Sequence, residues 1–321
     1  MGALADVEAL PPHQTLRQDR MSLSFPKILI VVRAGRNSLH RSWSHLCHKL
    51  ADVAVSTYDD TDWSGPDVNY LHHAPGGKFS GIKKFFEQYP NLTDTYDYIW
   101  AFEDDLLLPY SSLATTRDLL ARFRFQLAAP SLSYESFFSW PITVQNENML
   151  FRGTDFVEIM APIMSRDFLQ LALPHFDENF TSWGYEWLWR KLLNDRRSFA
   201  AILDAAPITH TRPLGQGSLY KDRSRTTATK EMADVIDKFV LDRGEHFRSL
   251  FGVTNDETPH LLLGDKLLNE MLGGYRRLLD YNFNGFSRCI DALLKKNRPV
   301  ATIDQMRGLD GFIKIEAGFP T

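Results

Sequence analysis

Three consecutive acidic residues, Glu103-Asp104-Asp105, end an apolar and aromatic run of the sequence. That run, Tyr98–Phe102, is typical of a buried strand, so it predicts a strand that delivers three carboxylates to the edge of a sheet. Adjacent carboxylates repel one another, and beside buried apolar surface they are costly unless a cation compensates them. A hard divalent ion such as Mg²⁺ or Mn²⁺ is the natural candidate. The alternative is a solvated acidic turn.

Three other residues have side chains suited to chemistry beside such a cluster. Glu186 falls in the first turn of a helix predicted to run to about Asn194, where the helix dipole favours an ionised carboxylate. Trp183 precedes it, and its broad apolar ring suits stacking on a sugar. His210 follows a predicted strand, Ala200–Ala206, and can complete an oxygen-rich metal site. The alternatives are a helix-start acid for Glu186 and a structural role for His210. Trp187 and Trp189, on the same helix as Glu186, are predicted to be core residues.

The first predicted strand is the continuous β-branched run Lys27–Val32, which is typical of a parallel sheet buried on both faces. Arg33 and Gly35 follow it, and we expect a helix from Leu39 to Leu50 with Ser38 as its cap. Gly35 permits close backbone approach, and a helix start after a parallel strand favours a phosphate or another anion. An ordinary turn is the alternative.

Two later segments offer further contacts to such a ligand. A second predicted strand, Val53–Thr57, leads into an acid-rich stretch that includes Asp59, which can contact a base or ribose or belong to a solvated loop. Lys78 follows a flexible glycine pair and precedes a predicted helix from about Ser80 to Tyr89. It can reach a phosphate, although Gly-Gly-Lys lacks the spacing of a P-loop.

An acid interrupts another apolar run, Phe156–Met164, which we predict to be a core strand. Glu158 needs a partner there. We expect a structural pair with a buried arginine, Arg152 or Arg166, and a catalytic role is the alternative. The preceding residues, 131–149, are rich in Ser, Asn and aromatic residues and predict loops over a pocket.

Strands that alternate with helices predict an α/β fold with a mostly parallel sheet, whose ligands lie beyond the carboxyl ends of the strands. From Lys230 onward the pattern predicts helices without strands, and one of them includes Phe247 and Phe251. The chain is therefore divided into three parts. They are a loose N-terminal extension (1–24), an α/β domain (25–222) and a helical C-terminal region (223–321).

Composition narrows the class of protein. The 321 residues are 44% hydrophobic and 12% aromatic, which is enough for a substantial core. A net charge of −4 gives no basis for predicting nucleic-acid binding. The two cysteines, Cys47 and Cys289, form no disulfide framework and fit a reducing compartment. With no signal-peptide core and no run of about 18 apolar residues, we expect a soluble cytoplasmic protein without a transmembrane segment.

The strand end Phe102-Glu103-Asp104-Asp105 resembles the DxD motif of GT-A glycosyltransferases, although its first acid is Glu. The chain also resembles, over about residues 26–217, the domain-of-unknown-function family 707 of bacterial and plant proteins, whose members are regarded as GT-A-like. Four motifs in this order carry that resemblance: Val31-Val32-Arg33-Ala34-Gly35-Arg36-Asn37-Ser38-Leu39-His40, Val157-Glu158-Ile159-Met160-Ala161-Pro162, Trp183-Gly184-Tyr185-Glu186 and Ile208-Thr209-His210. It implies a GT-A-like fold, Rossmann-like and mostly parallel, with a helical C-terminal region.

The resemblance also implies an activity. The protein would move a sugar from a nucleotide-diphosphate donor, with UDP expected, to a glycan or lipid-linked saccharide acceptor. Asp105 would coordinate Mn²⁺ or Mg²⁺ with His210 as a further ligand, and Glu103 or Asp104 would hold the ribose or the sugar. Assembly of a bacterial surface polysaccharide, with peripheral membrane association left open, is the expected setting.

The remaining roles follow from the same resemblance. Glu186 matches the position of the catalytic base of inverting GT-A enzymes and would deprotonate the acceptor hydroxyl. Arg33, Lys78 and Arg212 would be auxiliary contacts to the diphosphate, and Trp183 would contact the acceptor. Two other classes compete with this interpretation: a non-catalytic module that binds nucleotide sugars or carbohydrate, and a metal-dependent phosphohydrolase.

Overall fold

The computed structural model describes residues 24–213, 227–242, 247–296, 298–299, 302–309, 312 and 315. The predicted N-terminal extension lies outside this part of the chain except for its last residue. The predicted domain boundary at residue 222 also lies outside it.

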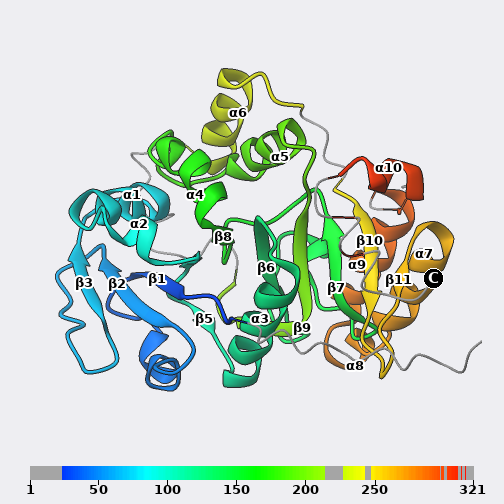
Figure 1. Ribbon diagram of the computed structural model, residues 1–321, viewed down its shortest axis with the longest axis horizontal. Coiled ribbons are helices and arrows are strands. Elements are labelled where there is room, and N and C mark those ends of the chain that lie inside the picture. The colour runs from blue at the N-terminus through cyan, green and yellow to red at the C-terminus, as the bar shows by residue number, and fades with distance from the viewer. Residues whose placement is uncertain are drawn as a thin grey trace, which may run out of the picture.

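The described strands form one sheet, with helices on both faces (Figure 1). The strands are β1 (Ile28–Ala34), β2 (Asp52–Thr57), β3 (Tyr70–His73), β4 (Tyr98–Phe102), β5 (Leu106–Leu107), β6 (Leu127–Leu132), β7 (Met149–Thr154), β8 (Ile163–Ser165), β9 (Ala200–His210), β10 (Ser249–Thr254) and β11 (Leu261–Leu262). Their order is β11-β10-β7-β9-β6-β8-β4-β1-β2-β3, and β5 pairs with the end of β9.

The α-helices are α1 (Lys78–Gln88), α2 (Leu92–Thr95), α3 (Tyr110–Phe123), α4 (Arg166–Ala172), α5 (Tyr185–Asp195), α6 (Ala228–Lys238), α7 (Gly264–Gly274), α8 (Leu278–Tyr281), α9 (Phe283–Lys295) and α10 (Ile303–Arg307). Short 3₁₀ helices are η1 (His40–Ser42), η2 (Ser44–Leu46), η3 (Pro141–Thr143) and η4 (Leu173–His175). Among the described residues, no helix combines the length and the apolar character that crossing a membrane requires.

The predicted α/β class is confirmed. Strands β3, β2, β1 and β4 are parallel neighbours, and β6 and β9 form a second parallel pair. Antiparallel pairing enters through β8, β7, β10 and β11. The parallel group places the ends of its strands at one edge of the sheet, which is the usual location of a ligand site.

Two cores cover the two faces of the sheet, and β1 contributes to both of them. Ile30 and Val32 pack on the face covered by α3 and the C-terminal helices. Leu29 and Val31 pack on the face covered by α1, α4 and α5. Every residue of β1 is buried, as its β-branched run predicted, because the strand lies between two helical layers (Figure 1).

The helix predicted from Leu39 to Leu50 is wrong. The segment forms the two 3₁₀ turns η1 and η2 instead. Its backbone is held to the end of β4, because the Leu39 N–H donates to the Asp104 carbonyl at 2.7 Å. Ser38 does not cap a helix, since its hydroxyl contacts the His40 ring at 2.7 Å. Tertiary contacts therefore outweigh the local helix pattern here.

The strand predicted over Phe156–Met164 is also wrong over most of its length. Strand β7 ends before it, at Thr154, and β8 begins only at Ile163, so the residues between them form a loop. The loop is buried nevertheless, and it forms part of a cavity wall. The apolar run therefore predicted correctly that this segment is buried, but it predicted the wrong secondary structure.

The C-terminal region contains helices α6 to α10, as expected, but the absence of strands was a wrong prediction. Strand β10 pairs antiparallel with β7 and, with β11, extends the same sheet. Gly153 makes this pairing possible, because a Cβ atom there would lie 2.2 Å from the Phe251 ring. Phe247 and Phe251 have helical spacing, but the close packing of β10 on β7 favours a strand over a helix.

A buried ion pair ties β7, β9 and the C-terminal helices together. Arg152 donates two hydrogen bonds of 2.8 Å to the two carboxylate oxygens of Asp204 and a third, of 3.0 Å, to the Tyr275 hydroxyl. The amide side chain of Asn146 donates to the Met271 carbonyl at 2.8 Å. Both charged side chains of the pair are fully buried. The bidentate geometry gives each charge the partner that burial requires.

We expect Arg152→Ala to destabilise the protein by about 3–5 kcal/mol, because it leaves the Asp204 carboxylate buried without its counter-charge. Urea unfolding followed by circular dichroism measures this loss. Lys191→Ala is the matched control, since it breaks an exposed ion pair with Asp195 and should cost less than about 1 kcal/mol. Equal losses for the two variants would contradict a stabilising role for the buried pair.

Candidate active site

Residues at or just beyond the carboxyl ends of β1, β2, β4 and β9 line a cavity of about 500 Å³. This is the edge at which the alternating pattern places a ligand. Nine of the predicted site residues line the cavity: Arg33, Lys78, Glu103, Asp104, Asp105, Trp183, Glu186, His210 and Arg212. Two others, Gly35 and Asp59, are not part of its lining.

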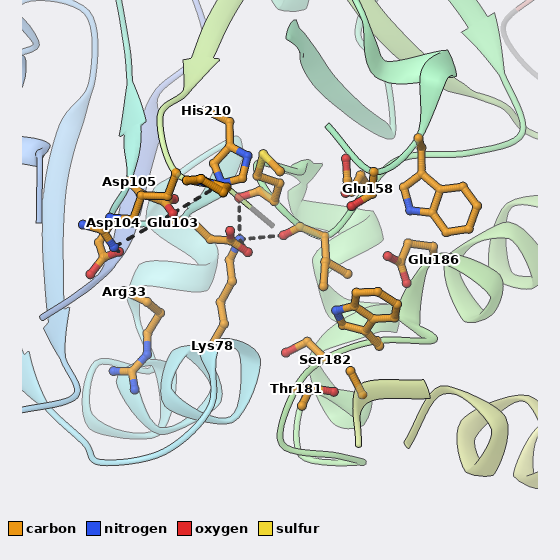
Figure 2. A pocket seen from close by; sticks show the side chains of 18 of the residues that line it. Arg33, Lys78, Glu103, Asp104, Asp105, Glu158, Thr181, Ser182, Glu186 and His210 are labelled. Carbon is orange, nitrogen blue, oxygen red and sulfur yellow. Dashed lines mark hydrogen bonds and ion pairs between the residues drawn. The ribbon is translucent and has the colours of Figure 1, made fainter. Parts of the chain in front are cut away.

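Figure 2 shows how the acidic groups of the cavity divide into two sets. Glu103, Asp105 and His210 lie together on one side of the cavity. Glu158 and Glu186 lie on the other side (Figure 2). The cavity therefore has one wall suited to a cation and a second wall with buried carboxyl groups.

Asp104 connects the ends of several strands through hydrogen bonds. Its Oδ2 accepts hydrogen bonds from the Gly35 N–H at 3.0 Å and from the Tyr58 hydroxyl at 2.6 Å. Its Oδ1 accepts one from Arg212 at 3.1 Å. Both oxygens of this buried carboxylate are thus engaged by the protein itself. Asp104 holds the loops after β1 and β2 against the end of β4.

Gly35 is needed for close packing by Tyr58. A Cβ atom at this position would lie 2.3 Å from the Tyr58 side chain, so any larger residue would displace the ring. Asp59 accepts hydrogen bonds from the N–H groups of Arg36 (2.8 Å) and Thr61 (3.0 Å). Both predicted ligand contacts thus have structural tasks in the turns around the cavity.

Arg33 is buried and is surrounded by backbone carbonyls. Its guanidinium donates to the carbonyls of Ser56 at 2.9 Å, Ala74 at 2.9 Å and Gly76 at 3.0 Å. Burial lowers the pKa of Arg33 to about 10, with Tyr58 opposing that shift, so the side chain stays charged at neutral pH. Its hydrogen bonds join the ends of β1, β2 and β3 beneath the cavity.

Lys78 begins α1 and reaches across the cavity floor (Figure 2). Its ammonium donates to the carbonyls of Ile159 at 2.5 Å and Met160 at 2.6 Å, and it lies 3.5 Å from the Glu103 carboxylate. Burial lowers the pKa of Lys78, while Glu103 opposes that shift. The side chain thereby connects the acidic strand end to the loop that follows β7.

Within the described chain, Glu103, Asp105 and His210 each offer a ligand atom, and these atoms lie within 4.8 Å of one another. The His210 Nδ1 is 2.7 Å from the Phe137 carbonyl, which assigns a proton to that nitrogen and directs Nε2 toward Asp105. The Asp105 Oδ1 is buried and has no partner among the described residues. Two oxygens and an imidazole suit Mn²⁺ or Mg²⁺, so the residues fit the predicted ion.

The Nε2 of His210 lies 3.3 Å from a carboxylate oxygen of Asp105. Burial favours a neutral imidazole, but the hydrogen bond and charge of Asp105 outweigh it and raise the pKa of His210 to about 9. Burial alone would raise the pKa of Asp105, yet His210 and Arg212 lower it. Metal binding here therefore requires loss of a proton from His210.

Arg212 follows β9 and lies between the acids and the first β–α turn. It donates to Asp104 at 3.1 Å and to the Asn37 carbonyl at 2.6 Å, and it lies 3.9 Å from Asp105. It supplies positive charge at the rim of the cluster. Three basic residues that follow it in the sequence, Lys221, Arg223 and Arg225, lie outside the described part of the chain.

Glu186 is in the first turn of α5, as predicted, and is buried. Gly184 precedes the helix with a φ of 100°, a left-handed conformation that favours glycine, and its N–H donates to the Glu186 carboxylate at 3.1 Å. Burial raises the pKa of Glu186 to about 7, although backbone hydrogen bonds oppose the shift. A carboxylate with a pKa near neutrality suits proton transfer.

The arginine pairing predicted for Glu158 is wrong. Arg152 pairs with Asp204, and Arg166 lies 3.2 Å from Asp97. Glu158 instead lies in the cavity wall, where burial, and then the charge of Glu186, raise its pKa to about 8. The sequence signal was present, since a lone acid within a buried run needs a reason, but the partner was misassigned.

Trp183 lines the cavity, and its carbonyl accepts a hydrogen bond of 2.7 Å from the Asn179 side chain. Trp187 and Trp189 belong to the core, as predicted. Ser139 and Trp140 also line the cavity, in the segment 131–149 that was predicted to form loops over a pocket. Sequence reasoning did not single out Thr181 and Ser182, because neither spacing nor periodicity gives a signal for these loop residues.

Comparison with known proteins gives only distant likenesses. The sequence matches no protein-family model, so membership in family 707 is not shown. No curated protein matches it either. A crystal structure of GalNAc-T7 with UDP, GalNAc and Mn²⁺ aligns with 66% of this chain, at a TM-score of 0.47 and 9% identity. The chain covers 48% of GalNAc-T7, about half of its length.

A second solved structure, S. aureus TarS 1-349 in complex with UDP-GlcNAc, aligns with 90% of this chain and 83% of its own. The TM-score is 0.45 and the sequence identity 10%.

The buried Glu158 carboxyl predicts a dependence of stability on pH. The folded protein holds this proton up to a pH of about 8, whereas the unfolded chain releases it near the ordinary value of 4.5. The folded state thus binds more protons over this interval, and the contribution of Glu158 to stability falls as the pH rises. We expect Glu158→Gln to remove this dependence. The free energy of unfolding of the variant, compared with that of wild type, should therefore rise by up to about 4 kcal/mol between pH 5 and pH 8.

Urea unfolding of both proteins at pH 5, 6, 7 and 8, with a chelator to exclude metal, measures the difference. A difference between wild type and Glu158→Gln that stays constant with pH would contradict the raised pKa of Glu158.

Proposed function

We propose that the protein is a metal-dependent glycosyltransferase that uses a nucleotide-diphosphate sugar, with UDP as the expected nucleotide. One observation carries this proposal. A single cavity brings together three side chains that offer ligand atoms for an ion, Glu103, Asp105 and His210, and a buried carboxyl group, Glu186, on the opposite wall (Figure 2). Sugar transfer needs both parts: positive charge at the leaving diphosphate and a base at the acceptor.

In this proposal Asp105 and His210 hold Mn²⁺ or Mg²⁺, and Glu103 completes the set or contacts the donor. The bound ion would supply positive charge to the diphosphate. Arg212 and Lys78 keep additional positive charge at this end of the cavity. Arg33, Gly35 and Asp59 shape the wall around the donor rather than contact it.

Glu186 is the proposed base. The acceptor hydroxyl gives its proton to the Glu186 carboxylate while its oxygen forms a bond to the anomeric carbon of the donor. The bond from that carbon to the diphosphate breaks, and the electron pair leaves with the nucleotide. Attack from the Glu186 side, opposite the leaving group, inverts the anomeric configuration. Burial, which places the pKa of Glu186 near 7, makes this proton transfer favourable at neutral pH.

Trp183 and the surrounding wall are assigned to the acceptor, a glycan or lipid-linked saccharide. The aromatic ring can pack on the apolar face of a sugar while nearby polar groups bind its hydroxyls. Cytoplasmic assembly of a surface polysaccharide, with peripheral contact to a membrane, remains the proposed setting. A non-catalytic nucleotide-sugar module is the competing proposal and predicts binding without turnover.

Calorimetry with UDP tests the metal site. We expect UDP to bind with Mn²⁺ present, and Asp105→Ala to weaken this binding by about 100-fold, because the variant loses a ligand of the ion. Asp265→Ala, which removes an exposed carboxylate from α7, is the control and should bind like wild type. UDP affinity that is independent of both Mn²⁺ and Asp105 would refute the proposed centre.

Turnover tests the base. We expect Glu186→Gln to lower sugar transfer by about 10²–10⁴-fold while UDP affinity stays at the wild-type value, because the amide cannot accept the proton. Released nucleotide, measured with a panel of common nucleotide sugars, gives the rate. Full activity of the variant, or a product with retained configuration, would exclude Glu186 as the base of an inverting reaction.

A further inference from the structure

Besides Nε of Arg33 and Oδ1 of Asp105, two buried polar atoms of cavity-lining residues lack partners among the described residues: Oε2 of Glu158 and Oγ of Ser182. Both residues line the cavity and are more than nine-tenths buried, with exposed fractions of 8% and 1%. An unpaired polar atom removed from water is costly, and native proteins rarely keep one without a purpose. Water or a ligand in the cavity is the remaining source of a hydrogen bond for each atom.

Ser182 is also held in an unusual backbone conformation. Its φ of 69° is in the left-handed region, which disfavours residues with a Cβ atom. Its neighbours enforce this conformation: the Ser182 N–H donates to the Asn179 side chain at 2.7 Å, and Thr181 donates to Glu231 of α6 through its N–H (2.7 Å) and its hydroxyl (2.6 Å). Glycine would fit this backbone better than serine. The presence of a serine here is therefore best explained by a function of its hydroxyl group.

The charge of this wall limits the kind of ligand. Neither Glu158 nor Glu186 forms an ion pair within the described chain, and burial favours the neutral carboxyl form of both, so this wall offers no positive charge to an anion such as a diphosphate. The cations of the cavity are engaged elsewhere, since Lys78 donates to two carbonyls and Arg212 to Asp104. A neutral ligand that both donates and accepts hydrogen bonds fits this wall.

Sugar hydroxyls have this chemistry. Each can donate to a carboxyl oxygen and accept from a serine hydroxyl, and a sugar ring carries several such groups around its edge. Trp140 and Trp183 line the same cavity and supply apolar surface for the ring itself.

We propose that Glu158 and Ser182 form a saccharide-binding subsite that recognises the hydroxyl groups of a sugar ring beside Glu186. This inference rests on the proposed function and adds to it the residues that select the sugar. The ring belongs either to the sugar being transferred or to the acceptor, since both must meet at Glu186.

Two variants remove the proposed contacts with little risk to the fold. Ser182→Gly deletes the hydroxyl and relaxes the left-handed backbone, so its melting temperature should not fall. Glu158→Met deletes both oxygens, keeps a similar volume and no longer buries a carboxyl group. Glu158→Gln retains hydrogen-bonding capacity and should give an intermediate effect. Ser249→Ala is the matched control, because its buried hydroxyl also lacks a partner among the described residues but lies outside this cavity.

Calorimetry in Mn²⁺ separates two sources of the ring. In the donor arm, UDP-glucose, UDP-galactose and UDP-N-acetylglucosamine are each compared with UDP. In the acceptor arm, methyl glucoside, methyl galactoside and cellobiose are titrated into the UDP complex. We expect the sugar-dependent gain in affinity to fall in one arm, by about 10-fold or more in Glu158→Met and by about 3- to 10-fold in Ser182→Gly. UDP affinity itself should not change.

A sugar-dependent gain that survives in both variants would overturn the assignment, as would its absence from the wild type in both arms. A loss equal to that of Ser249→Ala would overturn it as well. Failure of the proposed function has a different signature, because the wild type would then not bind UDP in a Mn²⁺-dependent manner.

Discussion

The site depends on how three adjacent carboxylates at the end of one buried strand are compensated. Each acid has a different solution: Asp104 is satisfied by hydrogen bonds from Gly35, Tyr58 and Arg212, and Glu103 has Lys78 within 3.5 Å. Asp105 has His210 at 3.3 Å and one buried oxygen without a partner in the described chain. Successive residues point in different directions, so one strand end can both lock the fold and leave a position for an ion.

The sequence was most informative where burial and charge meet. A parallel strand buried on both faces has a clear sequence pattern, and acids that follow it lie at the edge of the sheet. From this pattern Glu103, Asp105 and His210 were predicted to lie in one region. Glu186 lies in the first turn of a helix, as predicted, because helix starts have recognisable residues. Asp104 could not be distinguished from its neighbours, since its structural task depends on Tyr58, which is 46 positions away.

The failures share a physical cause. Apolar spacing reports burial, and burial does not distinguish a strand from a packed loop or a short helix from a 3₁₀ turn. Thus the residues around Glu158 became a cavity wall, and Phe251 became part of strand β10 because Gly153 leaves space on β7. Ser182 carried no signal at all, since its importance lies in a backbone angle that neighbouring side chains impose.

The buried Arg152–Asp204 pair has a consequence for the way the chain is divided. Asp204 and His210 are on the same strand, six residues apart, and Arg152 also bonds Tyr275 beyond α7. The C-terminal helices therefore support strand β9, which carries the His210 imidazole. Truncating the protein at the end of the first predicted domain would remove this support. The two predicted regions therefore depend on each other and form one folding unit.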